Sequence, residues 1–163
     1  MLKEKLTEIL ESNHNVLIFS QFVKHLELIE SYLQKRAITY SKLTGNTQNR
    51  EAAVSAFNDN SKCNVFLISL KAGGVGLNLT KADYVFVIDP WWNPFVEKQA
   101  IDRAYRIGQE KHVFAYHFIT KNTIEEKIQN LQRKKKNLSA ELLTGQNSVL
   151  AQLKKDDLQE LFS

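Results

Sequence analysis

The sequence predicts an α/β fold in which helices cover both faces of a central, mainly parallel sheet. Short, continuous apolar runs recur along the chain, and such runs are typical of strands buried on both faces. They lie at 16–19, 65–68, 84–89 and 113–119. Between them are segments whose apolar residues recur at helical spacing. Because strands that alternate with helices form βαβ units, this order favours a parallel sheet between two layers of helices.

The composition is typical of a globular domain with a core of its own. The chain has 163 residues, 43% of them hydrophobic, and its formal net charge of +4 is compatible with a polyanionic partner. Its only cysteine, Cys63, is expected to be a buried thiol in a reducing, intracellular setting. The histidines show no metal-ligand spacing with Cys63, so we expect no metal site. The polar opening residues do not resemble a signal peptide, and no apolar run approaches the ~20 residues that cross a bilayer.

The first part of the chain is expected to form a helix, a strand, a helix, a strand and a helix in turn. The opening helix ends near Asn13, and Ser20 is expected to cap the second helix. A strand is expected at 38–43, after which Thr47 would cap the third helix. The apolar faces of these helices are Leu2, Leu6, Ile9 and Leu10; Phe22, Leu26, Ile29 and Leu33; and Ala53, Val54 and Phe57.

The second part continues the alternation. Its members, in order, are a strand (65–68), a glycine-rich connection (69–79), a strand (84–89), a turn (90–94), a helix (97–109), a strand (113–119) and a long final helix capped by Thr123. Ligands of such folds bind at the carboxyl ends of the strands. Ser20, Ser69 and Asp89 are expected at that edge.

The helix at 97–109 is the first candidate for chemistry. Gln99, Arg103 and Arg106 are spaced i, i+4, i+7, so they share one face of the helix. Two neighbouring guanidinium groups repel unless an anion lies between them, and arginine binds phosphate oxygens bidentately. The alternative is a surface helix in which Asp102 pairs with Arg106.

The connection at 69–79 is the second candidate. It places Ser69, Lys71 and three glycines at one strand end, where backbone N–H groups can surround the phosphate of a nucleotide or of a nucleic acid. A tight structural connection would have the same composition. The chain contains no Walker A sequence and no paired carboxylates for Mg²⁺, so it lacks the main nucleotide-holding residues of an NTPase.

Two further segments have both a structural and a functional interpretation. Trp91 and Trp92 place two large rings in one loop, where they would either fill the core or meet a partner domain or a nucleic-acid backbone. Residues 133–136, one arginine and three lysines, span one helical turn. Such a run is typical of a solvated helix face and would also suit DNA.

Several segments together resemble the Swi/Snf family, which comprises ATP-dependent double-stranded DNA translocases of helicase superfamily two and includes chromatin remodellers. They occur in the family's order at 16–21, 43–45, 69–79, 89–94, 99–109 and 123–128. The resemblance, from about residue 14 to residue 131, is to the second, C-terminal RecA-like lobe, a three-layer α/β/α domain. The first lobe of the family holds the Walker A and Mg²⁺-binding residues. The Trp91–Trp92 pair is similar to bacterial members, whereas Tyr105 stands where the family usually has histidine.

The resemblance implies roles for individual residues. Arg106 would be the arginine finger, with Arg103 beside it facing the γ-phosphate of ATP. Nucleotide contacts would come from Gly76, Asn78 and Gln99. Contacts to the DNA backbone would come from Ser20, Gln21, Ser69, Lys71 and Gly73, with Arg50 as a further candidate. Trp92 and Asn93 would form the DNA-facing loop that couples these contacts to the arginine helix.

The resemblance also implies an organisation and partners. Residues 1–122 would form the lobe, residues 123–144 a brace-like helix returning to the first lobe, and residues 145–163 a short helical tail. The intact protein would use ATP, Mg²⁺ and double-stranded DNA, whereas this fragment alone would be an inactive monomer without cofactors. We expect a cytoplasmic, nucleoid-associated protein if it is bacterial and a nuclear one if it is eukaryotic. A non-enzymatic nucleotide- or DNA-binding module and an RNA helicase lobe stay open as alternatives.

Overall fold

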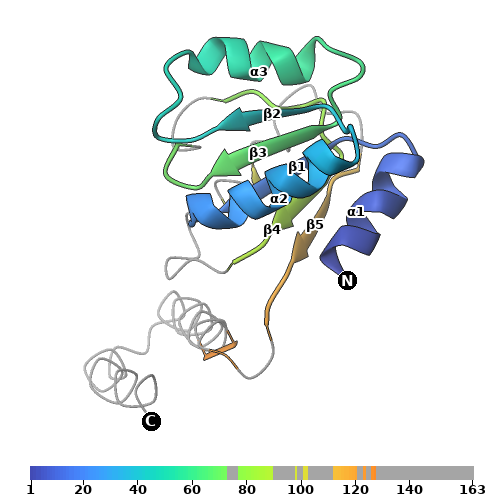
Figure 1. Ribbon diagram of the computed structural model, residues 1–163, viewed down its shortest axis with the longest axis vertical. Coiled ribbons are helices and arrows are strands. Elements are labelled where there is room, and N and C mark those ends of the chain that lie inside the picture. The colour runs from blue at the N-terminus through green and yellow to red at the C-terminus, as the bar shows by residue number, and fades with distance from the viewer. Residues whose placement is uncertain are drawn as a thin grey trace, which may run out of the picture.

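A five-stranded parallel sheet is the centre of the computed structural model, which describes residues 1–72, 77–89, 98, 101–102, 112–120, 123 and 126–127 (Figure 1). The described elements are α1 (Leu2–Glu11), β1 (Val16–Ser20), α2 (Val23–Lys35), β2 (Tyr40–Leu43), α3 (Arg50–Asn58), β3 (Val65–Ser69), β4 (Tyr84–Val87) and β5 (Phe114–His117). The strand order is β2-β3-β1-β4-β5, and every neighbouring pair is parallel. The predicted α/β fold with a parallel sheet is therefore confirmed.

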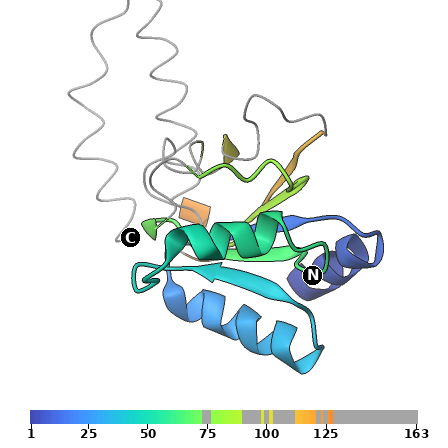
Figure 2. The ribbon, with the colours of Figure 1, turned by 90° about the horizontal axis from the view of Figure 1, so that it is seen from above.

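Helices cover both faces of this sheet. α1 and α2 lie on one face and α3 lies on the other, as Figure 2 shows from above. The fully buried strand β1 serves both layers, because alternate side chains point to opposite faces. Its Ile18 packs with Leu26 of α2, whereas its Phe19 packs with Phe57 of α3. Each such side chain contributes roughly 1.5–3 kcal/mol on burial, which explains the continuous apolar runs.

The two expected helix caps, Ser20 and Thr47, are wrong. α2 begins after Phe22, and Ser20 is the last residue of β1. α3 is capped by Asn49, whose side chain accepts a hydrogen bond from the N–H of Ala52 at 2.9 Å. Both predictions placed the helix two residues early, because polar side chains suited to capping also suit the turn that precedes the helix.

The strands are shorter than expected at 38–43, 84–89 and 113–119, where the structure has Tyr40–Leu43, Tyr84–Val87 and Phe114–His117. Ile38 lies in the turn that closes α2, since its N–H donates to the carbonyl of Leu33 at 3.0 Å. Cys63 is buried as expected, and burial raises the pKa of its thiol although Lys81 opposes this. The helix at 97–109, the brace-like helix at 123–144 and the tail at 145–163 lie almost wholly outside the described residues.

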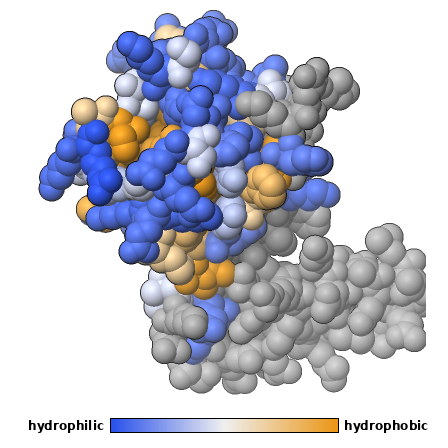
Figure 3. Space-filling view, turned by 90° about the vertical axis from the view of Figure 1, so that its right-hand side faces the viewer, coloured by the Kyte–Doolittle hydropathy of each residue, from blue (hydrophilic) through white to orange (hydrophobic). Residues whose placement is uncertain are grey.

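Hydrophilic residues dominate the surface of the described part on the side shown in Figure 3, where separate hydrophobic areas interrupt them. Two of the exposed large hydrophobic side chains, Phe22 and Phe114, are each about half exposed. Phe22 follows β1 and Phe114 begins β5, so they lie at opposite ends of the parallel strands. No helix within the described residues has the length and apolar character of a membrane span.

Candidate functional site

The carboxyl edge of the sheet, which is the side where the parallel strands end, brings together residues that are far apart in the sequence. Ser20 and Ser69 end β1 and β3 and are partners in the register of these two strands. The N–H of Leu70 donates to the carbonyl of Ser20 at 2.8 Å. Asp89 follows β4 on the other side of β1. The expectation that Ser20, Ser69 and Asp89 meet at this edge is confirmed.

Asp89 is the centre of this edge. Its side chain is fully buried, and its carboxylate accepts hydrogen bonds from the hydroxyl of Ser20 at 2.5 Å and from the backbone N–H of Gln21 at 2.7 Å. Nδ1 of His25, whose side chain is 43% exposed, lies 3.3 Å from the same carboxylate. A buried carboxylate needs such donors because an unpaired charge in the interior is costly. The turn after β1 is therefore fixed by a residue that follows β4.

Ser20 extends this arrangement into the beginning of α2. Its Oγ accepts a hydrogen bond from the N–H of Phe22 at 2.9 Å and also lies 3.0 Å from the Phe22 carbonyl. A hydroxyl has one proton to donate. We assign that proton to Asp89, because a carboxylate is the stronger acceptor and is also nearer. Ser20 is 0% exposed and its hydroxyl is engaged internally, so its role in DNA contact stays a prediction.

The glycine-rich connection begins beside Ser69 and Arg50. Oγ of Ser69, which is buried, accepts a hydrogen bond from the N–H of Ala72 at 3.3 Å. The guanidinium of Arg50, the first residue of α3, donates to the carbonyl of Ala72. Both side chains thus hold the backbone just before the glycines, while Lys71 is exposed. Arg50 is also exposed, so this basic pair lies at the surface of the carboxyl edge.

Asn78 lies away from this cluster. Its carbonyl accepts a hydrogen bond from the side chain of Asn58 at 3.0 Å, and Asn58 is the last residue of α3. Arg50 is the first residue of the same helix, about 12 Å away along its axis at 1.5 Å per residue. The structure therefore does not bring Asn78 together with Ser20 and Ser69. The Oδ1 atom of Asn58 is buried without a hydrogen-bond partner.

The other predicted site residues lie outside the described part of the chain. They are Arg103 and Arg106; Gly76 and Gln99; and Gly73, Trp92 and Asn93. Of the helix expected at 97–109, the structure describes Lys98, Ile101 and Asp102. The N–H of Asp102 donates to the carbonyl of Lys98 at 2.8 Å, and Ile101 packs on the core beneath α3. Ile101 thus contributes to the core, and the roles of the two arginines stay predictions.

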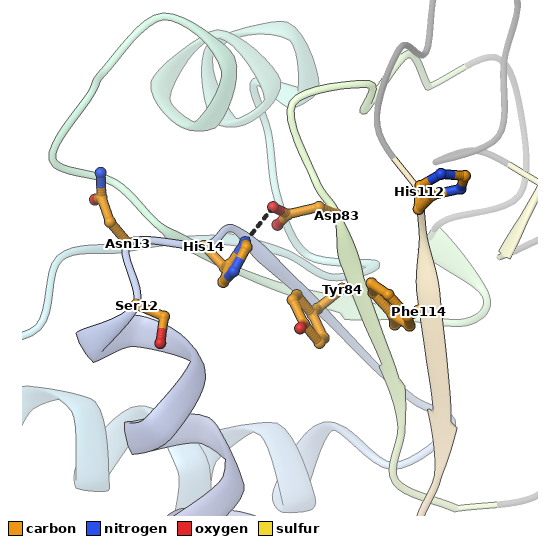
Figure 4. A pocket seen from close by; sticks show the side chains of 7 residues that line it. All are labelled: Ser12, Asn13, His14, Asp83, Tyr84, His112 and Phe114. Carbon is orange, nitrogen blue, oxygen red and sulfur yellow. Dashed lines mark hydrogen bonds and ion pairs between the residues drawn. The ribbon is translucent and has the colours of Figure 1, made fainter.

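The opposite, amino edge of the sheet carries a pocket of about 460 Å³ that the sequence did not indicate (Figure 4). It is lined by Ser12, Asn13, His14, Asp83, Tyr84, His112 and Phe114. The buried carboxylate of Asp83 lies 2.5 Å from Nδ1 of His14 and accepts the N–H of Asn15 at 2.8 Å. The rings of Tyr84 and Phe114 stack with their centroids 5.3 Å apart. Among the described residues, no group of three or more histidine, cysteine or acidic side chains could hold a metal ion.

Sequence reasoning did not assign a role to Asp83, His25 or Lys81. The ammonium of Lys81 donates to the carbonyls of Phe57, Asn60 and Cys63 at 2.7–2.8 Å, which satisfies acceptors near the end of α3. An aspartate immediately before or after an apolar run was a visible signal for Asp83 and Asp89. Their partners, however, depend on strand pairing.

A family model described as helicase conserved C-terminal domain matches residues 1–108. The chain belongs to this family. DNA repair protein RAD5B of Arabidopsis thaliana is 42% identical over 153 residues, which cover 93% of this chain and 12% of that protein. The ISWI chromatin-remodeling complex ATPase CHR11 of the same plant is 41% identical over 167 residues, 99% of this chain and 16% of that protein. The crystal structure of the C-terminal part of the Fun30 ATPase domain superposes with a TM-score of 0.76 at 39% identity and covers 80% of this chain and 43% of that chain.

These matches confirm the predicted C-terminal lobe of a helicase superfamily two protein with relatives of the Swi/Snf type. The chain spans less than a fifth of the length of the two curated relatives. Similar proteins come from plants and from fungi such as Schizosaccharomyces pombe. The expected bacterial origin therefore has no support from them.

Proposed function

We propose that this chain is the second motor lobe of an ATP-dependent double-stranded DNA translocase, and that it supplies arginine fingers and contacts to the DNA backbone. The proposal depends on the arrangement at the carboxyl edge. There the turn after β1 is bonded to Asp89 on one side and lies next to the connection after β3 on the other. These are two of the segments predicted to contact DNA. Membership of the helicase C-terminal family supports this assignment over an unrelated α/β module.

The chemistry of the described edge suits phosphate groups. Lys71 and Arg50 are exposed cations at one edge, and Gln21 lies beside them on the neighbouring strand end. Phosphate contacts of this kind position a protein on nucleic acid without reading its sequence. We therefore expect DNA binding that falls steeply as the salt concentration rises.

ATP and Mg²⁺ belong to the intact, two-lobe protein in this proposal. The described residues offer no metal-binding cluster, and the sequence has no Walker A motif, so the first lobe would hold Mg²⁺ and most of the nucleotide. A nucleotide between the lobes would supply the phosphoryl group that is transferred to water. Arg103 and Arg106 would neutralise charge on that group, a contribution of roughly 10³–10⁵ in rate for an arginine finger.

The names of the relatives favour one biological setting. They include a DNA repair protein and a chromatin-remodeling ATPase, so we propose that the intact protein remodels or repairs DNA-bound structures. Because these relatives come from a plant, we propose a nuclear rather than a nucleoid-associated protein.

The decisive experiment measures ATP hydrolysis by the intact protein that contains this lobe. We expect duplex DNA to stimulate hydrolysis, RNA to stimulate it much less, and the isolated 163-residue chain to hydrolyse no ATP. Preferential stimulation by RNA would instead identify an RNA helicase lobe. Hydrolysis that neither nucleic acid stimulates would refute the translocase, and no hydrolysis at all would favour a non-enzymatic binding module.

A further inference from the structure

The turn between β1 and α2 is held by Ser20, whose Oγ accepts the N–H of Phe22, and by Asp89, which lies outside the turn. Ser20 ends β1, Gln21 lies in the turn and His25 lies near the start of α2, and each of them contacts the buried carboxylate. α2 itself begins at an N-cap, Phe22, that makes no side-chain capping hydrogen bond. The conformation of the turn therefore depends on Asp89.

Asp89 also stands at a junction in the chain. β1 and β4 are paired, and the N–H of Ile88 donates to the carbonyl of Phe19 at 3.1 Å immediately before the cluster. The residue after Asp89 begins the segment 90–109, which contains the predicted DNA-facing loop and both predicted arginine fingers. The carboxylate of Asp89 is thus hydrogen-bonded to the turn after β1, which is one candidate contact segment. In the sequence, Asp89 directly precedes the other candidate segment, 90–109.

We propose that Asp89 is a positioning residue for DNA contact, whose carboxylate holds the turn carrying Gln21 in its binding conformation. This inference rests on the proposed function. Asp89 is fully buried and touches no nucleic acid; it acts through the Gln21 backbone and the Ser20 hydroxyl.

The sign of the change in DNA affinity distinguishes a positioning role of Asp89 from a simple electrostatic effect. Removing a negative charge close to a DNA-binding surface strengthens binding if charge alone acts, because phosphates repel carboxylates. A positioning role has the opposite sign, since asparagine offers one carbonyl acceptor and an NH₂ group that opposes the N–H of Gln21. Weaker DNA binding by the less negative variant is therefore the specific signature.

The experiment compares Asp89→Asn with Asp83→Asn in the intact protein. Asp83 is a matched control, because it is also buried, also flanks β4, and also accepts a β1-flanking backbone N–H and faces a histidine Nδ1. It lies at the amino edge. Both variants carry the same change of charge. The measurements are the duplex DNA concentration that gives half-maximal stimulation of ATP hydrolysis, the KM for ATP, and the melting temperature.

We expect Asp89→Asn to raise the required DNA concentration by roughly tenfold while the KM for ATP changes less than about twofold. Asp83→Asn should lower the melting temperature without changing the DNA requirement by more than about twofold. Equal DNA requirements for the two variants, or tighter DNA binding by Asp89→Asn, would overturn the positioning role. A wild-type protein that duplex DNA does not stimulate would overturn the proposed function and this inference together.

A second pair keeps the inference testable if Asp89→Asn does not fold. Ser20→Ala removes a fully buried hydroxyl from the cluster without changing charge, and Ser41→Ala removes a buried hydroxyl that bonds the Ala53 carbonyl between β2 and α3. Ser20→Ala should raise the DNA requirement by about threefold and Ser41→Ala should leave it unchanged. Equal behaviour of this pair would also overturn the inference.

Discussion

The two edges of the sheet carry nearly the same cluster. At the amino edge, Asp83 is buried, accepts the N–H of Asn15 and faces His14. At the carboxyl edge, Asp89 is buried, accepts the N–H of Gln21 and faces His25. The two aspartates flank the same strand, β4, and fasten the two ends of the same partner strand, β1.

The difference between the edges lies in what adjoins each cluster. The amino edge carries the short connections from helix to strand, and its cluster borders the pocket of Figure 4. The carboxyl edge carries the connections from strand to helix, which hold the predicted contact residues. In parallel sheets ligands bind at the carboxyl ends of the strands. Position in the fold, more than the local chemistry of a histidine–aspartate pair, therefore indicates which cluster serves function.

The largest expected effect is that of Arg106→Ala in the intact protein. If Arg106 neutralises charge on the transferred phosphoryl group, kcat should fall by roughly 10³-fold or more. Arg106→Lys should restore little, because an ammonium lacks the planar fork of a guanidinium. Steady-state ATP hydrolysis and the melting temperature would be measured on the same samples.

The competing interpretation of this helix gives the opposite pattern. A surface pair of Asp102 with Arg106 predicts near-normal turnover and a stability loss below ~1 kcal/mol. His14→Ala, at the amino edge, is the control that should leave kcat unchanged. Normal turnover in Arg106→Ala would reject the arginine finger and leave the carboxyl edge without its predicted catalytic group.

The next largest effect concerns stability at both edges. Asp83→Ala removes the acceptor of the buried Asn15 N–H and Asp89→Ala removes that of the part-buried Gln21 N–H, and an unsatisfied buried group costs about 1–3 kcal/mol. Asp89→Ala should be the more destabilising, because Asp89 is fully buried and also receives the Ser20 hydroxyl. Urea unfolding of the 163-residue chain would measure both losses. A larger loss in Asp83→Ala would show that the amino-edge cluster dominates stability.

The sequence predicted the layers but not these clusters, and the reason is physical. β1 and β3 consist largely of consecutive apolar residues, so the local sequence predicts that these strands are buried. The partners of Asp83 and Asp89 lie 64 to 69 positions away, and only the pairing of β1 with β4 brings them together. Ser20 shows the same limit, because its hydroxyl could serve a helix cap or a distant carboxylate and the local sequence does not distinguish them.

A smaller effect is expected from Glu30, which lies on α2 away from both clusters. Its carboxylate accepts hydrogen bonds from Lys42 at 2.5 Å and from Tyr40 at 2.8 Å. Partial burial alone would raise the pKa of Glu30, but these two bonds outweigh it and hold the pKa below its ordinary value of 4.5. A lowered pKa in the folded state means that the stabilisation is complete above pH 4.5 and is lost as the pH falls through the folded-state pKa.

Glu30→Gln should therefore destabilise the chain by about 1 kcal/mol at pH 7 and by less as the pH falls below 4.5. Glu8→Gln is the control, because it removes an exposed pair with Lys5 on α1. Urea unfolding at pH 7 and at pH 3.5 would show the difference. An effect of Glu30→Gln that does not shrink at the lower pH would contradict the assigned ion pair.

The smallest expected effect is a change in stability that depends on backbone conformation at the amino edge. α1 and α2 end in the same way, because the N–H groups of His14 and Ile38 donate back to Ile9 and Leu33. The residue before each of them is left-handed, with φ of 60° at Asn13 and 52° at Ala37. Asparagine tolerates this conformation, whereas alanine is strained by its Cβ atom at roughly 1–2 kcal/mol.

Ala37→Gly should therefore stabilise the chain by about 0.5 kcal/mol after the greater flexibility of glycine in the unfolded chain is subtracted. Asn13→Gly, the matched control, should change stability by less than that, and neither variant should alter the DNA dependence of the intact protein. A gain of stability in Asn13→Gly alone would show that backbone strain does not distinguish the two helix ends. A changed DNA requirement in either variant would refute the separation of a stabilising amino edge from a binding carboxyl edge.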